Sequence, residues 1–161
     1  MSRKSSHRAS RDESPAPIEH EVLGLIRFRC HLNPTCDEYE GTTEIDGAEV
    51  ELNLYSDEDL NITGTVTRTQ ELVRDHGAMS KRIAKYVADN VMPQYMNGWH
   101  QSGTRKPTRK EFMSQLTMMV LTVHADGKAT YWFDPGELFG GHILQLFMDS
   151  KSVITDHDTP G

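Results

Sequence analysis

An Asp-Gly pair between two strand-like segments constrains the fold of this chain more than any other feature. The pair is Asp46-Gly47, and it separates residues 39–45 from residues 48–55. A two-residue type I′ turn needs positive φ at both central positions, which Asp-Gly accommodates. In the second segment apolar and polar residues alternate, as in a strand with one buried and one solvated face. The sequence therefore predicts an antiparallel hairpin with Val50, Leu52 and Leu54 on its core face, opposite Glu49, Glu51 and Asn53.

The remaining apolar segments predict further strands around a second hairpin. Asp126-Gly127 repeats the turn pattern between residues 118–124 and residues 129–133. The other segments of strand length are residues 22–28, 143–148 and 153–155.

Between the two hairpins the apolar spacing changes to three and four residues, which is typical of an amphipathic helix. The predicted helix starts near Thr67, where Thr67 and Gln70 form a capping-box pattern, and it ends near Pro93. We expect His76 on its buried side to be a core residue with one hydrogen bond. The predicted stripe contains Leu72, His76, Met79, Ile83, Tyr86 and Asn90, with Val73, Val87 and Val91 beside it.

The order of elements predicts the fold class. After a loop over residues 94–106, Thr108 and Glu111 form a second capping box that begins a short helix. The result is an α+β fold, β-β-β-α-α-β-β-β, with a mainly antiparallel β-sheet and a central helical insertion. A doubly wound parallel sheet is not expected, because strands and helices do not alternate. The predicted domains are a disordered tail (1–17), a single α+β domain (18–156) and a frayed C-terminus (157–161).

The charge distribution favours one class of partner over others. Residues 1–17 contribute +2 to a net charge of −7, which leaves −9 on the rest of the chain. This acidic body argues against nucleic-acid binding, which needs clustered Lys and Arg, and is compatible with a basic protein partner. No apolar run approaches the roughly eighteen residues of a membrane span. The start of the chain lacks the apolar stretch of a secretory signal, so a cytoplasmic location is expected.

Short catalytic and metal-binding signatures are absent from the sequence. It contains no phosphate-binding glycine loop, no H-E-x-x-H and no G-x-S-x-G. Cys30 and Cys36 flank His31 without a second pair, so ordinary thiols are favoured over a zinc site or a disulfide. No metal or cofactor is therefore predicted.

Residues 134–143, D-P-G-E-L-F-G-G-H-I, are the densest group of chemically useful side chains. Asp134-Pro135-Gly136 is typical of a turn, because Pro fixes φ and Gly adopts the left-handed conformation. In a structural interpretation, the following glycines form a bulge and His142 bonds to backbone groups. In a catalytic interpretation, Asp134 or Glu137 orients His142 as a base or ligand.

Aromatic residues suggest a binding surface that includes the same segment. The candidate binding residues are suited to a groove for a partner or ligand, although core filling is the alternative role for such rings. They are Phe139, Gly140, Gly141 and His142, together with Trp132 and Trp99.

The segment 134–143, followed by an apolar strand, a polar turn and a short end strand, resembles a group of uncharacterised bacterial domain families. In these families a closing β-hairpin carries a motif of the form LF-G/W-GH-S/I, here L-F-G-G-H-I. The order and spacing of elements over residues 18–156 are also similar. Ile143 stands where serine is often expected, so no hydroxyl role is carried over. The resemblance implies a small accessory protein, immunity-like (toxin-neutralising) in some members.

Three functions are compatible with the sequence. A cytoplasmic protein-interaction module, of the immunity-like kind, is favoured by the acidic body and by the resemblance. A hydrolase or metal-dependent enzyme would use His142 with Asp134 or Glu137. A small-ligand sensor would use a pocket between the sheet and a helix.

Overall fold

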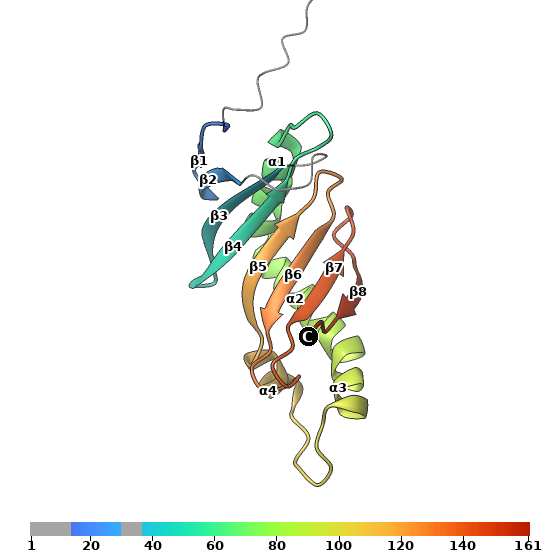
Figure 1. Ribbon diagram of the computed structural model, residues 1–161. Coiled ribbons are helices and arrows are strands. Elements are labelled where there is room, and N and C mark those ends of the chain that lie inside the picture. Colours follow the sequence, from blue (N-terminus) through green and yellow to red (C-terminus); the bar gives the residue numbers. More distant parts are fainter. Residues whose placement is uncertain (1–13, 30–36) are drawn as a thin grey trace, which may run out of the picture.

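The computed structural model describes residues 14–29 and 37–161, which form a β-sheet with helices against one face (Figure 1). Within these residues the sheet has eight strands in sequence order. The strands are β1 (Ile18–His20), β2 (Gly24–Arg29), β3 (Glu38–Ile45), β4 (Ala48–Tyr55), β5 (Thr117–Val123), β6 (Ala129–Asp134), β7 (Leu144–Met148) and β8 (Ile154–Asp158). The helical elements are α1 (Thr63–Arg74), α2 (His76–Tyr86), the π-helical turn η1 (Val87–Val91), α3 (Met92–Gly98) and α4 (Arg109–Ser114).

The α+β class with a central helical insertion is confirmed. Strands β1–β4 and β5–β8 form two antiparallel meanders, and the helices connect them. β4 and β5 pair in parallel, with Leu52 opposite Leu121 and Leu54 opposite Val123. The sequence pattern does not predict this pair. It arises because a helical crossover returns the chain to the end of the sheet at which β4 began.

The hairpin of β3 and β4 is confirmed in turn and register. Asp46 and Gly47 have φ of 51° and 78°, and Ile45 pairs with Ala48. The predicted core face is fully buried: Val50, Leu52 and Leu54 are each 0% exposed.

The predicted strand over residues 22–28 is confirmed from Gly24 onward as β2, whereas residues 21–23 form a turn that separates it from β1, a strand that the sequence pattern does not predict. His20 Nδ1 accepts the backbone N–H groups of Val22 and Leu23, each at 3.2 Å. Gly24 follows with φ of 70°. Such a local bond between a side chain and the backbone competes with a continuous strand, and apolar periodicity does not reveal it.

The helical segment begins earlier and continues further than predicted. α1 starts at Thr63, so Thr67 lies inside it and the predicted capping box is wrong. Pro93 lies in the first turn of α3, directly after the π-helical turn η1, and the helical segment continues past it to Gly98. The predicted loop over residues 94–106 is shortened accordingly.

The π-helical turn η1 changes which side chains of this segment are buried. Four apolar residues at four-residue spacing are at most 3% exposed: Met79, Ile83, Val87 and Val91. Their spacing exceeds the roughly 3.6 residues of an α-helical turn, and the wider turn absorbs the difference. The buried stripe therefore ends on Val87 and Val91. The sequence pattern also places Tyr86 and Asn90 in this stripe. In the structure, Tyr86 is half-buried and Asn90 is exposed.

The last strand extends beyond its predicted end. Leu146 pairs with His157 and Gln145 with Asp158, so residues 157 and 158 belong to the sheet. They are not part of a frayed terminus. Residues 1–13 of the predicted tail, and the segment with Cys30, His31 and Cys36, lie outside the described residues.

The core lies between the helices and the sheet face that they cover (Figure 1). His76 is in this layer, 8% exposed, and its Nε2 lies 3.1 Å from Asp46 Oδ2, in agreement with a core histidine held by one bond. No helix in the described part of the chain is long and apolar enough to cross a membrane.

Candidate functional site

Residues 134–143 form the connection between β6 and β7. Asp134 Oδ1 accepts the N–H of Gly136 at 2.8 Å, which closes the turn formed with Pro135. The side chains of Asp134 and Glu137 are both exposed. The carboxylate of Asp134 therefore already has a structural role in its own turn.

Phe139 anchors this connection in a cluster of rings from separate parts of the chain. Its buried ring makes edge contacts with Tyr95 and Trp99 at centroid distances of 5.6 and 5.8 Å, and with Phe112 of α4 at 6.3 Å. Gly140 lies against the same indole, because a Cβ at this position would come within 3.4 Å of the Trp99 ring. With His142, these four rings form what we call the aromatic cluster.

His142 lies at the edge of the aromatic cluster, half-buried. Its Nδ1 is 3.2 Å from the carbonyl oxygen of Thr159, so Nδ1 must carry the proton, because a carbonyl only accepts. The imidazole also meets the Trp99 ring at 5.0 Å, and Gly161 packs so closely against it that no side chain would fit there. Within the described residues, neither Asp134 nor Glu137 contacts His142. The structure thus favours the structural interpretation of the imidazole.

Of the predicted binding residues, Trp99, Phe139, Gly140 and His142 come together, with Gly141 exposed beside them. Trp132 does not join them. Its indole Nε1–H donates to Thr122 Oγ1 at 3.1 Å, on the sheet face that no described helix covers, which we call the open face.

The centre of the open face consists of side chains from the second meander. Residues that pair across strands point to the same side of a sheet, so the register identifies them. Trp132 pairs with Val120 and Gln145, and Thr130 pairs with Thr122 and Phe147. The centre is therefore formed by Val120, Thr122, Thr130, Trp132, Gln145 and Phe147.

Carboxylates stand on both sides of this centre. By the same register, β3 and β4 contribute Glu40, Glu44, Glu49 and Glu51, and β6 and β8 contribute Asp134, Asp156 and Asp158. Arg27 and Arg29 of β2 offset part of this charge, and Arg29 Nη1 lies 3.2 Å from Glu40 Oε2. The β2–β4 side also has a shallow cleft of about 490 Å³. The open face is thus acidic around a partly aromatic centre.

A second cleft, of about 440 Å³, opens between α2 with η1 and the β7–β8 turn. Sequence reasoning missed this cleft, because the apolar spacing places Tyr86 and Asn90 in the buried stripe. The uninterrupted four-residue spacing from Met79 to Val91 is compatible with a turn wider than an α-helix, but nothing in it indicates a cleft. The residues that line it are Arg82, Lys85, Tyr86, Asp89, Asn90, Lys151, Ser152, Val153 and Ile154.

Within residues 14–29 and 37–161, no group of three or more His, Cys, Asp or Glu side chains is arranged to hold a metal ion.

Comparison with known proteins gives a family match. A family model described as an uncharacterised protein conserved in bacteria (DUF2262) matches residues 20–158. No curated protein and no solved structure matches the chain.

Proposed function

The chain belongs to DUF2262, a family of uncharacterised proteins conserved in bacteria, and we propose that it is a protein-interaction module. The open face of the sheet binds a basic protein partner. The observation that carries this proposal is the placement of Trp132 and Phe147 at the centre of a face with carboxylates on both sides. Aromatic anchors at the centre and charged groups at the rim are typical of protein interfaces.

The charge pattern on β3 and β4 supports a binding role. Glu44 and Glu49 pair directly across the two strands, and both are exposed. Like charges directly opposite each other destabilise a strand pair, so the pairing costs stability in the free protein. A basic partner would remove that repulsion on binding. The same carboxylates would accelerate association by electrostatic steering, more strongly at low salt.

An immunity-like role is one form of this function. Proteins that act on nucleic acids carry basic surfaces, because they must neutralise phosphates. An acidic face with an aromatic centre has the complementary chemistry to cover such a surface. In that case the partner is a basic toxin that this chain neutralises.

Affinity capture from the source bacterium tests the proposal. The full chain serves as bait, alongside Glu51→Lys/Asp156→Lys, which reverses charge on both sides of the centre. We expect a basic protein to be retained by the natural chain and lost with the double variant. Higher salt should also weaken capture, because the screening length falls from about 10 Å at 0.1 M to about 3 Å at 1 M.

The matched control is Glu58→Lys/Asp59→Lys, at two exposed carboxylates in the loop before α1. It changes the net charge by the same amount as the first double variant, without touching the open face. If this control abolishes capture as completely as Glu51→Lys/Asp156→Lys, total charge rather than the open face is responsible. Capture of an acidic partner, or capture unaffected by Glu51→Lys/Asp156→Lys, contradicts the proposal.

The hydrolase alternative needs a carboxylate beside His142. Among the described residues, the contacts of the imidazole are the Thr159 carbonyl, Trp99 and Gly161, which are those of a packed side chain. The geometry therefore favours the interaction module.

A further inference from the structure

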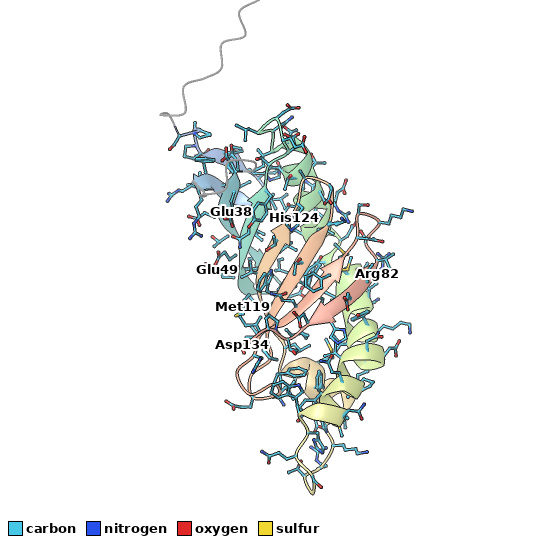
Figure 2. All side chains as sticks on the ribbon, turned by 45° about the vertical axis from the view of Figure 1, so that its right-hand side comes forward. Glu38, Glu49, Arg82, Met119, His124 and Asp134 are labelled. Carbon is cyan, nitrogen blue, oxygen red and sulfur yellow. The ribbon has the colours of Figure 1, made fainter. Side chains whose placement is uncertain are left out.

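We propose that the cleft between α2 and the β7–β8 turn binds a small amphipathic anion, with an apolar body and one acidic group. This site is separate from the open face, because its walls are helix α2, turn η1 and the beginning of β8. Figure 2 shows Arg82 of this cleft on the α2 side of the molecule, away from Glu49 of the open face. Its volume, about 440 Å³, suits a small molecule and is too small for a folded domain.

The charge of the cleft is opposite to that of the chain. Arg82, Lys85 and Lys151 line it against one carboxylate, Asp89, which gives a net charge of +2 in a chain of net charge −7. Asp89 is already paired, with its Oδ2 2.5 Å from Lys85 Nζ. The acidic group of a ligand would therefore meet a surplus of cations at the rim.

The two walls of the cleft contribute an apolar patch, formed by Tyr86, Val153 and Ile154. Val153 is 55% exposed, and Tyr86 and Ile154 are half-buried beside it. An apolar body seated here would remove this surface from water, which stabilises the complex roughly in proportion to the area covered. The combination of this apolar patch with the surrounding cations is suited to an amphipathic anion rather than to an inorganic ion.

The helical wall is fixed before any ligand arrives. The Tyr86 hydroxyl bonds His157 Nδ1 at 3.1 Å, and His157 Nε2 bonds Gln94 Oε1 in turn. Asn90 Nδ2 donates to the carbonyl of Tyr86 at 3.1 Å, across the π-helical turn. A preorganised wall loses little conformational freedom on binding, which favours affinity.

The opposite wall, the β7–β8 turn, is also held in place. Asp149 Oδ1 accepts the N–H groups of Lys151 and Val153, each at 2.9 Å. Ser152 adopts φ of 64°, and its carbonyl and hydroxyl accept from Arg82 at 3.3 Å and from Arg68 at 2.9 Å. These bonds present the side chains of Lys151 and Val153 to the cleft.

Two fluorescent probes of the same shape test the site. The anionic probe is 8-anilinonaphthalene-1-sulfonate, and N-phenyl-1-naphthylamine has the same aromatic body without the sulfonate. We expect the sulfonate to bind the folded chain saturably and several-fold more tightly than the neutral probe. Amide resonances of residues 82–90 and 151–154 should shift on titration, and those of the open face should not. Equal affinity for the two probes, or shifts confined to other residues, overturns the proposal.

Variants at exposed positions distinguish the contribution of the cationic side chains to binding from that of the apolar patch. Lys151→Glu should weaken sulfonate binding by about fivefold or more, because one cation is replaced by an anion within a few ångströms of the acidic group. Val153→Ser should weaken the binding of both probes. Lys81→Glu is the matched control, since Lys81 is an exposed residue of α2 outside the lining. An equal loss from Lys81→Glu and Lys151→Glu would mean that net charge, rather than the cleft, attracts the sulfonate.

Discussion

At the scale of single residues, the polar and aromatic side chains of residues 134–143 have structural roles in turns and packing. Asp134 closes a turn, Phe139 fills the core and the His142 ring is capped by Thr159 and Trp99. Gly140 is favoured by its positive φ of 59°, and a Cβ at this position would touch the Trp99 ring at an ordinary van der Waals distance. The residue types alone suggested an active site, whereas their partners determine a structural role.

Gly140→Ala should destabilise the protein by about 1–2 kcal/mol, because the left-handed conformation brings Cβ close to the following carbonyl. Urea denaturation with intrinsic fluorescence measures the change. Gly77→Ala in α2 is the control, since no atom lies within 4 Å of its added Cβ and its φ is not positive. That variant should be neutral or more stable by up to about 1 kcal/mol. A neutral Gly140→Ala variant would contradict the stated role of this glycine.

At the scale of elements, a sequence pattern predicts the structure correctly where the residues that interact are close together in the sequence. The capping box of α4 is confirmed, with Thr108 Oγ1 accepting from Glu111 N at 3.2 Å and the Glu111 carboxylate accepting from Thr108 N at 2.7 Å. Arg105 adds two bonds to the same carboxylate, at 3.0 and 2.6 Å. Hydrogen bonding from Arg105, and then from the Thr108 backbone, lowers the pKa of Glu111 from 4.5 to about 2.

The lowered pKa of Glu111 predicts a specific pH dependence. Because the folded pKa lies below the unfolded one, the contribution of the carboxylate to stability is present above about pH 4.5 and is lost as the pH falls toward 2. The difference in unfolding free energy between the natural chain and Glu111→Gln should therefore shrink over that interval. Chemical denaturation at a series of pH values measures it.

Thr108→Ala is the companion variant for this measurement. It removes the cap at the Glu111 N–H, which carries no charge, so a cost of about 1 kcal/mol should persist near pH 2, where the Glu111 carboxylate becomes protonated. If the deficit of Glu111→Gln stays constant between pH 4.5 and 2, ionisation of this carboxylate does not stabilise the fold.

At the scale of the whole molecule, the parallel pairing of β4 and β5 joins two meanders into one sheet (Figure 1). Leu52 and Leu121 face each other across this junction and are 0% and 1% exposed. The helices that connect the meanders pack against the face to which both leucines belong. We therefore expect the two halves to unfold as one cooperative unit.

Leu52→Ala should lower stability by about 2–5 kcal/mol through the cavity that it leaves. The two tryptophans, Trp99 and Trp132, lie outside the first meander. If the sheet is cooperative, tryptophan fluorescence and far-ultraviolet circular dichroism should still give the same, lower urea midpoint. The exposed Glu58→Ala should leave both midpoints unchanged. Separate midpoints for the two signals in Leu52→Ala would show that the meanders unfold independently.

Elements whose causes are local could be predicted from the amino-acid sequence. The Asp46-Gly47 turn, the alternation along β4 and the cap of α4 each depend on residues a few positions apart, and each was predicted. The α+β class follows from these elements and their order. The four-residue spacing from Met79 to Val91 is also compatible with η1, once the mismatch with an α-helical turn is considered.

Four features could not be predicted from the sequence: the parallel junction, the partners of His142, the open face and the cleft beside α2. Each depends on residues brought together from distant parts of the chain. His142 meets Thr159 and Trp99, and Arg82 reaches Ser152. Periodicity identifies which face of an element is apolar, but it does not identify what that face packs against. Contacts between distant segments therefore show that the imidazole of His142 is a packed side chain rather than part of an active site. Such contacts also form the cationic cleft, at a place where the sequence predicts only a helix.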